Sequence, residues 1–156
     1  MSSLVGFGDQ RPVVSVGYAG FARNSDLAAR LRAAGVERLV DVRALASSRR
    51  RGFSKTALAG ALAAQGIEYA HMRALGNPGP GRELYRSGRV AQGRALFENH
   101  LRAQRATLEE LAVTIAQRRC ALMCACADPA SCHRSAIIDA LRSQLRLVLD
   151  VIDISA

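Results

Sequence analysis

The chain has 156 residues, of which 49% are hydrophobic and 22% charged, and these values fit one soluble globular domain with its own core. No apolar run approaches the roughly 18 residues that span a bilayer, so we expect no membrane segment. Residues 1–10 lack a basic start followed by an apolar stretch, which predicts no signal peptide and hence a cytoplasmic location. In a reducing cytosol, the four cysteines are expected to be thiols or metal ligands rather than disulfides.

The formal net charge of +9 favours anionic partners, such as a nucleic acid, a nucleotide or another anionic small molecule. However, Lys55 is the single lysine among 22 basic residues, and GC-rich coding alone can produce such an arginine excess. Aromatic residues make up only 4% of the chain and Trp is absent, so a base-stacking platform is hard to build.

Strand-like and helix-like segments alternate along the chain after a loose leader at residues 1–11. The apolar runs predict strands over residues 12–16, 36–42, 67–70, 120–124 and 147–152. The amphipathic runs and their Gly and Ser boundaries predict helices over residues 24–35, 54–66, 92–118 and 131–145. This alternation predicts one Rossmann-like α/β domain over residues 12–156. It would have three layers, with helices on both faces of a mostly parallel sheet of about five strands.

Two segments depart from this regular pattern. Residues 72–91 are rich in Gly and Pro and show no periodicity, so we expect a functional or mobile loop whose 76–81 part closes over a site. Residues 92–118 carry two apolar stripes, which fit either one helix or two helices with a bend near Arg105.

Polar and reactive residues follow the expected strands at the points where these end. Because the carboxyl ends of parallel strands share one edge of the sheet, we expect these residues to meet in a ligand-binding crevice there. They are Gly17, Tyr18, Asp41, Arg43, His71 and the segment 124–134.

Arginines near the second strand are candidate anion contacts. Asp41 and Arg43 point the same way on an extended chain, so they form either a structural ion pair or an anion site in which Asp41 orients Arg43. The basic run at residues 47–55, with Ser48 and Arg49, precedes a helix start and is either a phosphate grip or a solvated loop. Neither the three-glycine dinucleotide motif nor a Walker lysine motif occurs, so nicotinamide and P-loop nucleotide cofactors are not indicated.

The densest chemical cluster is the segment CACADPASCHR at residues 124–134. Cys124, Cys126, Cys132 and His133 could bind a metal ion such as zinc or iron, although the spacing matches no familiar zinc pattern. Alternatively, Cys132 lies near a helix start where its thiolate would be stabilised, as in a nucleophilic or redox enzyme. A phosphatase-type loop needs an Arg six positions after its Cys. The residue six positions after Cys126 is Cys132, so this motif is excluded. A third reading is that the cysteines are buried apolar residues of a strand.

The order of these motifs resembles the domain of unknown function 488 (DUF488) family over residues 12–152. The residues that carry the resemblance are Gly17-Tyr18, Asp41-Val42-Arg43, Ser48-Arg49, Phe53-Ser54-Lys55, Leu75-Gly76, Leu122-Met123-Cys124 and Cys132-His133-Arg134. The resemblance implies a small α/β domain whose marked positions are Asp41, Arg43, Ser48, Arg49, Cys124, Cys132, His133 and Arg134, and it implies no reaction.

Two positions depart from the family's pattern. Cys126 stands where the family commonly has Glu, so an acid or base role there would be lost, or replaced by a thiol that binds metal or forms a reversible disulfide. Asn77 stands where a second Gly usually follows Gly76.

The leading hypothesis is an enzyme-like domain that binds an anionic small molecule or nucleotide, with phosphate as the expected anion. Cys124 or Cys132 would act as nucleophile or redox thiol, His133 would carry the proton, and Asp41 would be a further catalytic residue. Gly17, Tyr18, Arg43, Ser48, Arg49, His71 and Arg134 would bind the substrate. One alternative is a nucleic-acid-associated module of repair or defence that uses residues 49–55 and Arg82, Arg86, Arg89 and Arg94. The other is a metal-dependent hydrolase or metal sensor.

Overall fold

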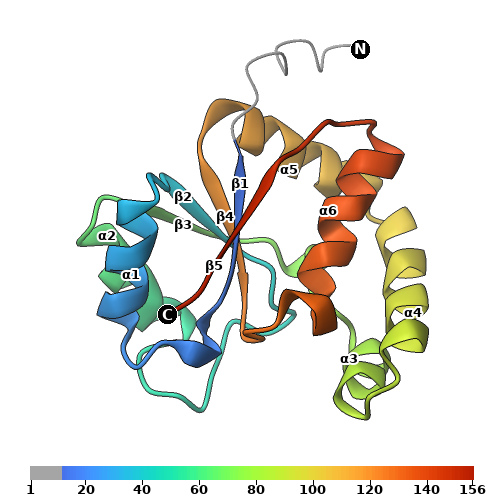
Figure 1. The fold of residues 1–156 in the computed structure, drawn as a ribbon, viewed down its shortest axis with the longest axis horizontal. Helices are drawn as coiled ribbons and strands as arrows, with labels where there is room; N and C mark the ends of the chain where they lie inside the picture. Colours follow the sequence, from blue (N-terminus) through green and yellow to red (C-terminus); the bar gives the residue numbers. More distant parts are fainter. Residues whose placement is uncertain (1–11) are drawn as a thin grey trace.

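The structure is a computed structural model that describes residues 12–156, and the expected leader at residues 1–11 lies outside the described residues. One sheet of five parallel strands, in the order β3-β2-β4-β1-β5, runs through the centre of the molecule (Figure 1). Its strands are β1 (Val13–Gly17), β2 (Arg38–Asp41), β3 (Glu68–His71), β4 (Cys120–Cys124) and β5 (Val151–Ile154). The prediction of a parallel α/β sheet is confirmed.

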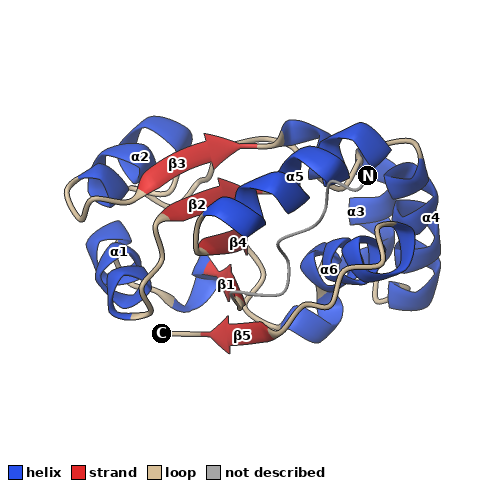
Figure 2. Cartoon of the chain, turned by 90° about the horizontal axis from the view of Figure 1, so that it is seen from above, coloured by secondary structure: helices blue, strands red, loops and turns tan. Residues whose placement is uncertain are grey.

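Helices cover both faces of the sheet, so the molecule has the three layers predicted (Figure 2). The helices are α1 (Asn24–Ala33), α2 (Lys55–Ala63), α3 (Gly79–Arg86), α4 (Val90–Arg102), α5 (Arg105–Gln117) and α6 (His133–Gln144). One face carries α1 and α2 and the other carries α5 and α6, while α4 packs on the outside of α6 and α3 packs on α4. Within residues 12–156, no helix is long and apolar enough to cross a membrane.

The two faces of the sheet have separate cores because successive strand residues point to opposite sides. Val13 and Leu122 belong to the core under α4, α5 and α6, whereas Val14 and Met123 belong to the core under α1 and α2. β1 and β4 are buried along their whole length, which explains why their sequences are apolar runs without alternation.

The register of the strands places their last residues in one row. Gly17 pairs with Cys124, and Asp41 pairs with Met123 on one side and with His71 on the other. The turns that leave β1, β2, β3 and β4 therefore start at the same edge of the sheet, as the parallel arrangement predicts.

The prediction of a loop over residues 72–91 is wrong. Most of this segment is α3 together with a short 3-10 turn at Arg73–Leu75. Proline does not disrupt α3, because Pro78 is its N-cap and Pro80 lies in its first turn, where no intrahelical amide bond is lost.

Two other boundaries of helices and strands could not be determined from the sequence. The segment 92–118 is interrupted after Arg102, so α4 and α5 are separate helices, one of the two expected arrangements. The last strand starts at Val151 instead of residue 147, because Arg146 has a positive φ of 57° and the buried Leu147 and Leu149 anchor an irregular connection.

Cys120 belongs to the core and lies at the opposite end of β4 from Cys124. Burial raises the pKa of its thiol from the ordinary 9.0 to about 11. Between these values the unfolded chain loses the proton while the folded chain keeps it, so stability should fall as the pH rises from 9 to 11. We expect this loss of unfolding free energy to be on the order of 2 kcal/mol in the natural protein and to be absent in Cys120→Ala. The measurement is urea unfolding of both proteins at pH 8, 9, 10 and 11. Parallel curves for both proteins would contradict this assignment.

Candidate active site

A cavity of about 470 Å³ opens at the carboxyl edge of the sheet, a size that suits a small-molecule ligand. It is lined by Tyr18, Arg43, Ala44, Leu45, Ser47, Asn77, Arg82, Tyr85, Arg86, Cys124, Ala125, Cys126, Ser131, Cys132 and His133. The turns after β1, β2 and β4 supply one wall, and α3 together with Asn77, which precedes its N-cap, supplies another. The structure therefore brings six of the residues predicted from sequence together: Tyr18, Arg43, Cys124, Cys126, Cys132 and His133.

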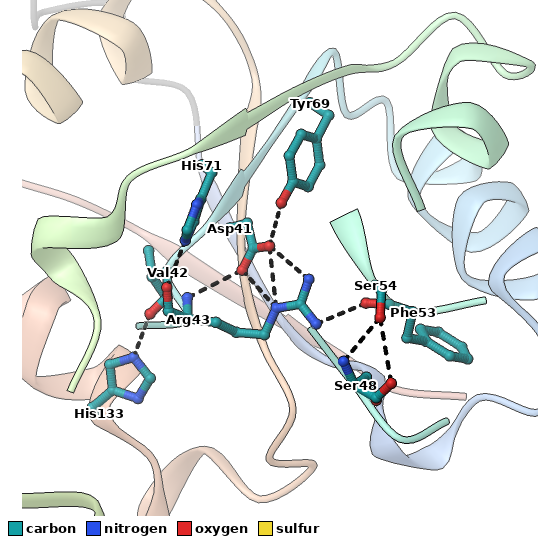
Figure 3. Close-up of polar contacts among 9 residues, drawn as sticks. All are labelled: Asp41, Val42, Arg43, Ser48, Phe53, Ser54, Tyr69, His71 and His133. Carbon is teal, nitrogen blue, oxygen red and sulfur yellow. Dashed lines mark hydrogen bonds and ion pairs between the residues drawn. The ribbon is translucent and has the colours of Figure 1, made fainter. Parts of the chain in front are cut away.

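Asp41 and Arg43 form a buried ion pair behind this cavity (Figure 3). The Arg43 guanidinium donates to Asp41 through Nε at 2.9 Å and Nη2 at 2.7 Å, and its Nη1 donates to the Phe53 carbonyl at 2.7 Å. Tyr69 donates its hydroxyl to the same carboxylate, and Tyr18 lies under the guanidinium at 5.4 Å. Burial alone lowers the pKa of Arg43, but its hydrogen bonds to Asp41 raise it above the ordinary value. Of the two roles considered for this pair, the structural one fits these contacts, because each of the three guanidinium nitrogens already donates a hydrogen bond within the protein.

Cys132 is the N-cap residue of α6, and its sulfur lies among three polar groups. The Cys124 sulfur is 2.7 Å away, Arg134 Nε donates to the Cys132 sulfur at 3.3 Å, and His133 Nδ1 is 3.8 Å away. Both cysteines line the cavity although each side chain is only 2% exposed. A helix N-terminus and a guanidinium both favour the thiolate, so this site can hold a negative sulfur.

The pKa values of Cys124 and Cys132 are shifted in opposite directions. Hydrogen bonds from the Cys124 and Cys126 thiols lower the pKa of Cys132 well below its usual range, and His133 acts in the same direction. Hydrogen bonds with Cys126 and Cys132, together with burial, raise the pKa of Cys124. These shifts favour the protonated form of Cys124 and the thiolate form of Cys132.

Arg134 is buried beneath the cavity instead of lining it, with 1% of its side chain exposed. Its three nitrogens donate to the Cys132 sulfur, to the Ser15 hydroxyl at 3.0 Å and to the Cys126 carbonyl at 2.7 Å. The guanidinium therefore contacts the Cys132 sulfur directly, and Arg134 is not among the residues that line the cavity.

The His133 ring is oriented by the end of β2. Its Nε2 lies 2.8 Å from the Val42 carbonyl, and because a carbonyl only accepts, this nitrogen carries the proton (Figure 3). The other ring nitrogen, Nδ1, faces the Cys132 sulfur at 3.8 Å, a position from which it can exchange a proton with that sulfur. Phe97 packs edge-on against the ring with centroids 5.1 Å apart and restricts its rotation.

Gly17 supports the cysteine turn through the absence of a side chain. A Cβ atom at this position would lie 1.5 Å from the Cys126 carbonyl oxygen, so only Gly permits the turn after β4 to cross here. Ala19 also donates its amide to the Ala125 carbonyl at 2.9 Å. Gly17 is thus a packing position behind the cavity, outside the set of residues that line it.

Three other predicted contacts lie away from the cavity. Ser48 bonds within its own loop, where its amide donates to the Ser54 hydroxyl and its hydroxyl accepts from the Arg50 amide. Arg49 is exposed and does not line the cavity, and His71 donates from Nε2 to the Arg43 carbonyl at 2.7 Å. The basic run contributes a structural residue instead, since Arg50 donates to the Tyr18, Ala19 and Phe21 carbonyls.

The second wall of the cavity comprises Asn77, Arg82, Tyr85 and Arg86. The sequence had indicated Arg82 and Arg86 only as nucleic-acid contacts, and it had not indicated Tyr85. These residues belong to the segment that was expected to be a loop. The spacing of Arg82, Tyr85 and Arg86 by three and four positions is a helical signal, but the Gly and Pro residues around it hid this signal.

Three of the four candidate metal ligands lie close together. Cys124, Cys132 and His133 have their ligand atoms within 4.8 Å of one another and could hold a metal ion, and this group does not include Cys126.

The fold and the thiol site together define a small α/β domain with a cysteine centre at the carboxyl edge of a parallel sheet. Residues 24–141 match the family described as "Domain of unknown function DUF488", so the chain belongs to the DUF488 family, as its motifs indicated. The comparisons with curated proteins and with solved structures find no match.

The Asp41–Arg43 pair should be essential for stability. In Asp41→Asn the buried guanidinium of Arg43 loses its counter-charge, which should cost about 3–5 kcal/mol of unfolding free energy. The matched control is Asp26→Asn, which breaks an exposed pair with Arg23 and should cost about 0–1 kcal/mol. Equal losses in urea unfolding would show that the buried pair is not a structural centre.

Proposed function

We propose that this protein is a cysteine-dependent enzyme whose Cys132 thiolate attacks an anionic small molecule bound in the cavity at the carboxyl edge of the sheet. The observation that carries the proposal is the burial of Arg134 without a carboxylate partner among the contacts of residues 12–156. A buried guanidinium needs a compensating negative charge. Among its three bonded partners, only Cys132 can supply one.

The substrate class follows from the charges that remain unused. Arg43 is neutralised by Asp41, whereas Arg82 has no ion pair in the described part of the chain and Arg86 pairs only with the exposed Glu83. Both arginines line the cavity with their side chains exposed. An anionic group, with phosphate as one example, would bind between these guanidinium groups while the electrophilic part of the molecule faces Cys132.

The proposed reaction is a nucleophilic displacement. In the reactive form the proton of Cys132 already lies on Nδ1 of His133, and the thiolate sulfur forms a bond to the electrophilic atom of the substrate. The leaving group departs with the electron pair of its bond and takes the proton from His133. Water then displaces the sulfur and returns a proton to the site, so the free enzyme is regenerated.

Alkylating reagents of different charge test this proposal without a known substrate. Iodoacetate carries a carboxylate, whereas iodoacetamide is neutral and of similar size, and both alkylate thiolates. We expect the iodoacetate-to-iodoacetamide rate ratio at Cys132 to exceed the ratio for glutathione in the same buffer. The Arg82→Gln and Arg86→Gln variants should each lower that ratio about twofold to fivefold, the effect of one exposed ion pair.

The measurement is peptide mapping by mass spectrometry of the folded protein. Arg89→Gln is the matched control, because Arg89 is an exposed arginine of the same region that does not line the cavity. The proposal fails if Cys132 is inert to both reagents, or if Arg89→Gln lowers the ratio as much as the two cavity variants.

A metal centre is the second candidate function, favoured by the convergence of Cys124, Cys132 and His133. Two thiolates and an imidazole suit zinc or iron, which would activate a water molecule in a fourth position. Two sulfur ligands of one tetrahedral zinc lie about 3.8 Å apart, given Zn–S bonds of about 2.3 Å. The observed separation of 2.7 Å is shorter, so metal binding requires the sulfurs to move apart.

Elemental analysis of the purified full-length chain separates the two candidates. Under the thiol proposal, we expect less than a tenth of an equivalent of zinc or iron, with unchanged Cys132 alkylation after treatment with a chelator. Near-stoichiometric metal, with Cys124 and Cys132 alkylated only after chelation, would establish the metal centre instead.

A further inference from the structure

Two polar groups in the cavity lack any hydrogen-bond partner. Among residues 12–156, three buried side-chain atoms are without a partner: Arg38 Nε, Asn77 Oδ1 and Tyr85 hydroxyl. The last two belong to residues that line this one cavity. Buried polar groups in proteins are nearly always bonded, so their coincidence in one cavity calls for a physical reason.

The surroundings of Asn77 exclude a structural role for its amide oxygen. Asn77 is 97% buried, since only 3% of its side chain is exposed, and it precedes the N-cap of α3 without capping the helix. Its Oδ1 lies directly over Gly81, where a Cβ atom would be only 2.2 Å away. The fold therefore leaves room for this oxygen at Gly81 but gives it no donor.

Tyr85 presents its hydroxyl on the same wall, one helical turn beyond Gly81. The ring is held by α4, because a Cβ atom at Gly93 would lie 3.0 Å from Tyr85 Cδ2. Burial raises the pKa of Tyr85, so its hydroxyl keeps its proton and remains both a donor and an acceptor. Arg82 and Arg86 extend from the same helix into the cavity lining.

We propose that Asn77 and Tyr85 recognise a neutral hydroxyl or amide N–H group on a ligand whose anionic group binds to Arg82 and Arg86. Asn77 Oδ1 accepts from this group, and the Tyr85 hydroxyl donates to the ligand or accepts from it. The inference deepens the proposed function, on which it rests for the choice of this cavity as the substrate site. It narrows the substrate class to hydroxylated or amide-bearing anions.

Two sulfonates that differ only in one hydroxyl test this class. Isethionate and ethanesulfonate are both fully ionised and carry no proton on the sulfonate. NMR titration of the ¹⁵N-labelled full-length chain should give isethionate a Kd about fivefold to tenfold lower, as expected for one net hydrogen bond. Asn77→Leu should reduce this preference to about one while leaving the Kd for ethanesulfonate unchanged. Equal binding of the two sulfonates, or binding of neither, would overturn the proposal.

Stability without ligand provides a second readout. A buried polar atom without a hydrogen-bond partner destabilises the folded protein, because its desolvation is not compensated. Asn77→Leu and Tyr85→Phe remove such atoms and should each raise the Tm of the ligand-free protein by about 2–4 °C. The matched controls are Asn24→Leu and Tyr69→Phe, which remove groups bonded to the Gly52 carbonyl and to Asp41 and should lower the Tm. A fall in Tm for the cavity variants would show that their polar groups have partners within the protein.

The titration does not depend on the reactivity of Cys132, so the two proposals fail separately. Preference for isethionate with an inert Cys132 would leave a binding site without thiol chemistry. A reactive Cys132 with equal binding of the sulfonates would leave the thiol enzyme and remove the recognition wall.

Discussion

The contacts of Arg134 are the interaction on which the cysteine centre depends. Its guanidinium connects β1 through Ser15, the turn after β4 through the Cys126 carbonyl, and the first turn of α6 through the Cys132 sulfur. Burial of a guanidinium is costly unless hydrogen bonds and a counter-charge compensate it. The three contacts supply the hydrogen bonds, and the Cys132 sulfur is the one partner among them that can carry a negative charge.

The second buried guanidinium of the site has a different role. Arg43 has Asp41 as its counter-charge, and Tyr69 and the Phe53 carbonyl complete its bonding. This pair fixes the end of β2, whose Val42 carbonyl in turn orients the His133 ring. Two arginines that look equivalent in sequence thus differ in function, because one meets a carboxylate and the other meets a thiol.

The fold was predictable from sequence because its signals are local and repeated. Buried runs such as residues 120–124 and helix boundaries such as Gly35 and Gly66 determine the alternation of strands and helices, and parallel strands then require a common edge. That rule alone predicted that residues 17, 41, 124 and 132 lie close together at this edge. The α3 wall was not predictable in this way, because Gly and Pro residues lower helix propensity and only packing on α4 overrides it.

Contacts made at atomic distance were beyond the reach of the sequence. Nothing in the pattern of residues distinguishes Arg49, which is exposed, from Arg50, which bonds three carbonyls of the turn after β1. Likewise, the orphan atoms of Asn77 and Tyr85 exist only because neighbouring backbone leaves them without donors. Such properties depend on the sum of surrounding groups, which sequence spacing does not specify.

The departure at Cys126 can now be separated into its backbone and side-chain parts. Its carbonyl accepts from Arg134 and its oxygen occupies the space above Gly17, so the backbone contacts at this position do not depend on which side chain is present. The side chain is exposed at the cavity. A change between Glu and Cys at this position therefore leaves the backbone support of Arg134 intact, whereas it replaces the thiol that acts on the pKa of Cys132 and faces the cavity.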